Sequence, residues 1–229
     1  MEPNIPLATG STSLGLSQNR VLRNTYLLLA ISLVPTVIGA MVGVNMNFGF
    51  MRASPIMMAI GTIAIFYGWI WAIEKNRDSS LGVGLLLGFT FFMGLLLGPL
   101  LQRTLGMGNG GQLIGLAAGG TAAVFFAMAG IATTTKRDLT GMGKFLGIGV
   151  IVAMVLVIAN IFFQSTAVHM TILAIFIPLS AMLMLYQLHA VVRGGETNYI
   201  SATLSIFISI YNLFSALLQM LGIFGGRDD

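Results

Sequence analysis

The chain has 229 residues, and only 8% of them are charged, with 11 Lys or Arg against 7 Asp or Glu. Soluble domains carry about 25% charged residues. Hydrophobic residues make up 56% of the chain and its mean hydropathy is +0.93, more apolar surface than one soluble core of this length can bury. An ordinary water-soluble fold is therefore excluded, and a lipid bilayer is the expected solvent. The net charge of +4 comes from scattered basic residues, so nucleic-acid binding is not expected. The absence of cysteine excludes disulfides.

Seven apolar segments are long enough to cross a bilayer, which takes about 20 residues. They follow residues 1–20, a polar stretch expected to be a disordered cytoplasmic tail, and precede a short polar tail at 226–229. The expected spans are 26–45, 54–73, 81–101, 112–133, 145–163, 168–190 and 199–222. A cleaved signal peptide is the alternative for the first span, but its apolar stretch is longer than such peptides carry. The prediction is an all-α integral membrane fold, with residues 21–225 forming one domain of seven transmembrane helices.

The basic residues predict the orientation of these spans, because Lys and Arg collect in cytoplasmic loops. The side of the N-terminus holds Arg20, Arg23, Lys75, Arg77, Lys136, Arg137, Lys144 and Arg193. The other side holds Arg52, Arg103 and Arg227. The N-terminus is therefore expected in the cytoplasm and the C-terminus on the opposite side.

Many of the 29 glycines recur four residues apart inside the spans. Examples are Gly39 with Gly43, Gly94 with Gly98, and the series Gly111, Gly115 and Gly119. Small residues one turn apart let helices approach closely in lipid. Packing within the chain is the expected reason, and a homodimer interface is the alternative.

Polar residues follow one face of the last expected span. They are Ser201, Ser205, Ser209, Asn212 and Gln219. Their spacing is helical, so they form one stripe, and a stripe facing lipid would leave these side chains without partners. The last helix is therefore expected to lie inside the bundle.

Three further polar residues belong to the fifth and sixth spans. Gln187 lies near the cytoplasmic end of its span, and Asn160 and His169 lie near the opposite end of theirs. A histidine there could sense pH or simply anchor a helix end. Asn160, Gln187 and the stripe together form the candidate pore or polar core. Hydrogen bonds that hold helices together and an ion pathway both remain open for this set.

A tight cytoplasmic turn is expected between the sixth and seventh spans. Its residues are Gly194, Gly195, Glu196, Thr197 and Asn198. Glycine can end the first helix in a left-handed conformation, and Thr or Asn can cap the next. Glu196 would then meet the positive end of the following helix dipole.

No combination of residues predicts an enzyme or a cofactor. The chain has no H-E-x-x-H sequence, no pair of intramembrane aspartates and no Ser and His at a telling spacing. The last span has no lysine that could bind retinal. A non-enzymatic protein without a cofactor or a metal is expected.

Residues 194–200, Gly-Gly-Glu-Thr-Asn-Tyr-Ile, and residues 211–214, Tyr-Asn-Leu-Phe, resemble the Bax inhibitor-1 family, and in particular its bacterial branch. Weaker matches at 22–26, 119–122 and 159–162 extend the resemblance over nearly the whole chain from about residue 20. The resemblance implies a bacterial inner-membrane protein with six helices around a central, C-terminal seventh.

The resemblance implies two activities. Some bacterial members are similar to an inner-membrane protein that binds and restrains the membrane-anchored, ATP-dependent AAA protease. Modulation of that protease is the expected function here, through residues 1–20 and the loops at 74–80 and 134–144. The alternative is a calcium leak channel, whose family members use an acidic pair on helices six and seven as a pH-sensitive gate. Those positions fall on Gln187 and Ser209, which cannot ionise. The oligomeric state is left open.

Overall fold

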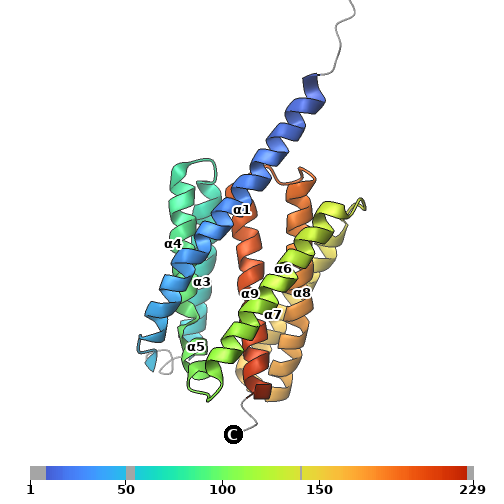
Figure 1. The fold of residues 1–229 in the computed structure, drawn as a ribbon. Helices are drawn as coiled ribbons and strands as arrows, with labels where there is room; N and C mark the ends of the chain where they lie inside the picture. The colour runs from blue at the N-terminus through green and yellow to red at the C-terminus, as the bar shows by residue number, and fades with distance from the viewer. Residues whose placement is uncertain (1–8, 50–54, 140, 226–229) are drawn as a thin grey trace, which may run out of the picture.

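The computed structural model describes residues 9–49, 55–139 and 141–225, and the regular structure among them is helical. The helices are α1 (Thr9–Val44), α3 (Pro55–Lys75), α4 (Ser80–Leu96), α5 (Gly98–Leu105), α6 (Gly110–Thr134), α7 (Met142–Phe163), α8 (Thr166–Val192) and α9 (Tyr199–Gly225). They form an upright bundle, with α3, α4 and α5 on one side of α9 and α7 and α8 on the other (Figure 1).

The bounds agree with the expected spans to within a few residues, except at the N-terminus. Helix α1 begins at Thr9, so the structure has helix at residues 9–20, within the tail that was expected to be disordered. No proline interrupts residues 9–20, so the helix of the first span can extend through them. Figure 1 shows this part of α1 projecting past the other helices. The remaining tail residues, 1–8 and 226–229, lie outside the described residues.

Six described segments are long and apolar enough to cross a membrane. They are Gln18–Val44, Ser80–Leu105, Gly110–Thr134, Met142–Phe163, Thr166–Val192 and Tyr199–Gly225. The second of these contains α4 and α5, which meet at Leu97 because Pro99 cannot donate the next helical hydrogen bond. Large apolar side chains face outward along α1 and α7, as a lipid environment allows.

Helix α9 is the centre of the bundle. None of its residues from 199 to 223 is exposed, and its apolar side chains share one core cluster with Leu28, Leu86, Phe89 and Met184 from α1, α4 and α8. Among the described residues it packs against α1, α3, α4, α5, α6 and α8. Within the described part of the chain, α7 packs against α8 and against no other helix. Six helices were expected to surround α9, but in the described ranges α7 does not contact it and lies outside this ring.

The glycine series divide between two environments. A Cβ at Gly39 or Gly94 would collide with a backbone carbonyl of the facing helix, so α1 and α4 pack backbone to backbone, as expected. On α6 the expectation of packing within the chain is wrong, because a Cβ on Gly111, Gly115 or Gly119 would meet nothing within 4 Å among the described residues. That face of α6 points out of the bundle.

Candidate functional site

The polar stripe of α9 points into the bundle. Ser201 and Ser209 are buried, and Ser205, Asn212 and Gln219 are half-buried. The stripe does not form one continuous cluster, because its members contact partners at three levels along the helix. The first level lies near the start of α9, the second near its middle, and the third at its C-terminal end.

At the first level, the start of α9 is tied to the α3–α4 connection. The Ser201 hydroxyl donates a hydrogen bond of 2.9 Å to Glu74 Oε2, and Glu74 also lies 3.5 Å from the Arg77 guanidinium. The Asn198 side-chain amide donates to Asp78 Oδ1 at 2.8 Å. Neither Glu74 nor Asp78 had been singled out from the sequence. The signal that could have singled out Glu74 is its place at the very end of an apolar span.

The α8–α9 turn holds the start of α9 in place through its own hydrogen bonds. Gly194 has φ +75°, the left-handed conformation that ends α8. Asn198 Oδ1 accepts from the backbone N–H groups of Ile200 and Ser201, so Asn198 is the N-cap of α9. Glu196 Oε1 accepts from the Asn198 N–H. Gly195 donates its N–H to the carbonyl of Ala190, and Thr197 is exposed.

At the second level, α8 and α9 are joined through uncharged side chains. The Ser209 hydroxyl donates a hydrogen bond of 2.9 Å to Gln187 Oε1 and lies 3.3 Å from the Ser205 carbonyl. These two residues stand where the family resemblance places the acidic pair. A hydroxyl and a carboxamide carry no charge at physiological pH, so this contact is a neutral bond between two helices.

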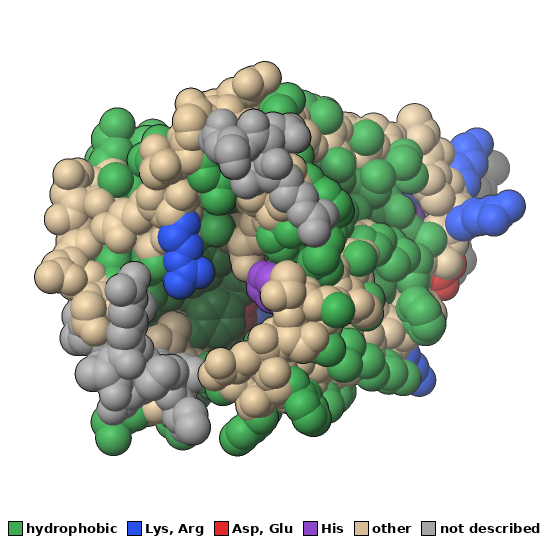
Figure 2. Space-filling model, turned by 90° about the horizontal axis from the view of Figure 1, so that it is seen from below, with side chains coloured by type: hydrophobic (Ala, Val, Ile, Leu, Met, Phe, Trp, Pro, Cys, Tyr) green, Lys and Arg blue, Asp and Glu red, His purple; other side chains and the backbone are tan. Residues whose placement is uncertain are grey.

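At the third level, three residues of the predicted set meet at a cavity between α7, α8 and α9. Asn160, Asn212 and Gln219 line this cavity of about 250 Å³ together with His169 and Ser215. Ser215, which the sequence had not singled out, has a buried hydroxyl with no hydrogen-bond partner among the described residues. Figure 2 shows this end of the molecule, which is hollowed near its centre.

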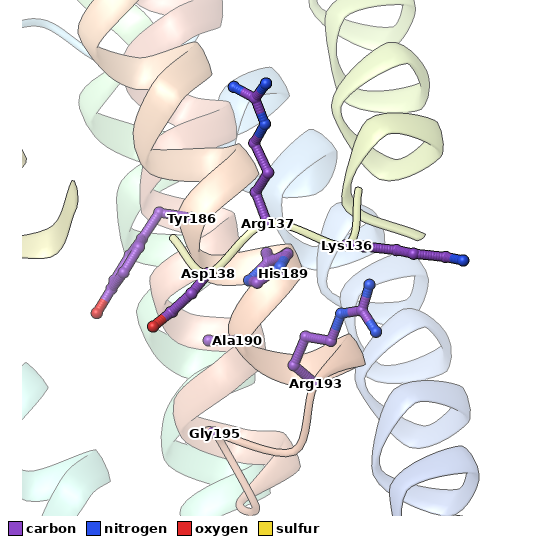
Figure 3. A pocket seen from close by; sticks show the side chains of 8 residues that line it. All are labelled: Lys136, Arg137, Asp138, Tyr186, His189, Ala190, Arg193 and Gly195. Atoms are coloured by element: carbon purple, nitrogen blue, oxygen red, sulfur yellow. The ribbon is translucent and has the colours of Figure 1, made fainter. Parts of the chain in front are cut away.

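A second cavity, of about 450 Å³, lies at the opposite end, between the α6–α7 connection and the last turn of α8 (Figure 3). His189 belongs to this cavity and had not been singled out either. Among the described residues, no group of three or more His, Asp or Glu side chains could hold a metal ion. The fold and these polar levels define a helical, multi-pass membrane protein whose innermost helix is hydrogen-bonded to Glu74 near its start and to Gln187 near its middle.

The comparisons with known proteins agree with this class. The sequence model of the family described as inhibitor of apoptosis-promoting Bax1 matches residues 18–226. An uncharacterized protein of Neisseria meningitidis serogroup A is 44% identical over 215 residues, covering 93% of this chain and 94% of the relative. The "Modulator of FtsH protease YccA" of Escherichia coli K12 is 39% identical over 213 residues, with the same coverage. The chain therefore belongs to the Bax inhibitor-1 family.

Proposed function

We propose that this chain is an inner-membrane protein that binds and modulates a membrane-anchored, ATP-dependent AAA protease. The observation that carries the proposal is the 39% identity over 93% of the chain to a relative named for modulation of FtsH protease. A strain of E. coli O6:H1 has a relative of the same identity named as an inner membrane protein. The function is non-enzymatic. The protein acts by binding the protease and limiting its access to substrates.

The proposed topology has seven spans, with α3 as the one beyond the six described above. The N-terminus then lies in the cytoplasm and the C-terminus on the opposite side, because Lys and Arg collect at the N-terminal end. The first turns of α1 would project into the cytoplasm past the loops at 74–80 and 134–144 (Figure 1). This end is the proposed contact surface for the protease, because it is polar and stands clear of the bundle.

Co-purification tests the proposal. The tagged chain is extracted in mild detergent from cells that also produce the protease, and the retained protease is quantified. The full chain is expected to retain it, and deletion of residues 2–17 is expected to weaken retention, because it removes the projecting part of α1 and leaves the span from Gln18 intact.

The matched control is deletion of residues 226–229, which follow the end of α9 in the sequence. This control should retain the protease. If the folded full chain retains no protease, the proposed function is wrong. If both deletions retain it equally, the binding surface has been placed on the wrong part of the chain.

The second candidate is a cation leak pathway along α9. The observation that favours it is the cavity of about 250 Å³ lined by Asn160, Asn212 and Gln219. Two of these residues, Asn212 and Gln219, belong to the same polar stripe of α9 as Ser209. Calcium flux into proteoliposomes tests this candidate. It predicts flux that Asn212→Leu abolishes, that the exposed control Asn45→Leu leaves unchanged, and that does not respond to pH, because Gln187 and Ser209 do not titrate. Absence of flux from the folded chain would exclude it.

A further inference from the structure

The cavity of about 450 Å³ at the N-terminal end of the bundle is built from two connections that carry basic residues. Lys136 and Arg137 come from the α6–α7 connection, and Arg193 from the end of α8. Asp138 is the one acidic residue among its lining residues, so the charged side chains around the cavity are three basic and one acidic. The Arg193 guanidinium donates to the backbone carbonyl of Thr135, which holds the α6–α7 connection against α8. This hydrogen bond between the end of α8 and the α6–α7 connection therefore fixes the basic side of the cavity.

His189 lies inside this cavity with an unused hydrogen-bonding atom. Its side chain is 7% exposed, and its buried Nε2 has no hydrogen-bond partner among the described residues. Figure 3 shows the ring in the middle of the labelled side chains, between Asp138 and Arg193. A buried polar atom without a hydrogen-bond partner is unfavourable. A ligand that accepts or donates a hydrogen bond here would remove that penalty.

The cavity adjoins the C-terminal end of α8, where the negative end of the helix dipole disfavours an anion, so the basic side chains must offset it. The carbonyl groups of the last turn of α8 already accept hydrogen bonds within the turn, from the N–H groups of Arg193, Gly194 and Gly195. Lys136 and Arg137 are exposed and extend outward in Figure 3. Their long side chains can fold over the mouth of the cavity without movement of the backbone. The cavity can therefore surround an anionic group with two or three cations and a histidine.

The cavity also adjoins an apolar surface that faces outward. Tyr186 lines it and packs so closely on α7 that a Cβ at Gly143 would lie 2.7 Å from the Tyr186 hydroxyl. Two residues further along α7, Phe145 is 67% exposed, and Ile148 follows on the same outward side at 62%. A ligand here would meet basic groups at one end and an exposed apolar helix at the other. An anionic phospholipid has this combination of a phosphate headgroup and acyl chains.

We propose that this cavity binds the phosphate headgroup of an anionic phospholipid of the cytoplasmic leaflet, with Lys136, Arg137 and Arg193 around the phosphate, His189 as a hydrogen-bonding partner, and the acyl chains along α7. The site lies at the same end of the bundle as the proposed protease contact surface, but lipid binding there does not require the protease. Its consequence is that the α6–α7 connection is ordered by lipid, so the chain is more stable in an anionic membrane than in a zwitterionic one.

Thermal unfolding of the full chain in detergent tests the site. Short-chain phosphatidylglycerol, short-chain phosphatidylcholine of the same chain length, and inorganic phosphate are titrated separately. Phosphatidylglycerol is expected to raise the unfolding temperature in a saturable way, and the other two are not. The double variant K136Q/R137Q is expected to weaken the apparent affinity for phosphatidylglycerol about thirtyfold, because each basic residue near anionic lipid contributes about fivefold.

The matched control is R20Q/R23Q, which removes two exposed basic residues from the same end of the bundle but outside the cavity. It should bind phosphatidylglycerol as the unaltered chain does. Equal responses to both phospholipids, or equal losses in the two double variants, would overturn the proposal. A response to inorganic phosphate as large as that to phosphatidylglycerol would overturn the assignment to a lipid.

Discussion

The Ser209 hydroxyl donates a 2.9 Å hydrogen bond to Gln187 Oε1, and this bond joins α9 to α8 where the family resemblance places two acidic residues. The pair can hold the two helices together at any physiological pH, because neither side chain changes its charge. A pH-sensitive gate of two carboxylates is absent from this contact.

Replacement of this pair by acids should make stability depend on pH. In the double variant Q187E/S209D, two ionised carboxylates would repel each other inside the bundle at neutral pH. The free energy of unfolding should fall by roughly 1–3 kcal/mol at pH 7 and recover as the pH falls and one carboxyl becomes protonated. Thermal unfolding between pH 5 and 8 measures this. The control N45D/Q112E places two acids at exposed positions, and its pH profile should match that of the unaltered chain.

The close packing of α1 on α4 predicts different effects for two glycine substitutions. Gly94→Ala places a Cβ against the Thr36 carbonyl and should lower the free energy of unfolding by about 1–3 kcal/mol. Gly115→Ala places a Cβ in open space on α6 and should be close to neutral. Chemical unfolding in mixed micelles compares the two. A loss of stability in Gly115→Ala would show that this face of α6 is covered by another helix.

The cap of α9 predicts a local destabilisation. Asn198→Ala removes the acceptor for the N–H groups of Ile200 and Ser201 and the bond to Asp78, and should reduce stability by about 1–2 kcal/mol. The neighbouring Thr197→Ala is the control, because Thr197 is exposed. Hydrogen exchange at the first turn of α9 should accelerate in Asn198→Ala only. Equal exchange in both variants would argue against a capping role.

Sequence reasoning locates the helices well because long apolar segments between charges leave little choice in lipid. It placed the start of α9 correctly from Gly194 and Asn198, whose roles depend on local backbone geometry. It expected a disordered tail where α1 extends over residues 9–20, because polar composition does not reveal that a helix can continue out of a span. It also could not show that α7 lies off α9 or that Glu74 accepts from Ser201. Those contacts depend on how helices distant in sequence pack together, and neither the order of the spans nor their periodicity contains that information.

The central proposal is that this chain modulates a membrane-anchored AAA protease. The most direct test is to reconstitute the purified protease and a membrane-protein substrate in vesicles, with and without equimolar full-length chain, and to measure the rate of substrate degradation. The account predicts slower degradation when the chain is present and less slowing when residues 2–17 are deleted. An unchanged degradation rate, with all three proteins folded in the same vesicles, would contradict it.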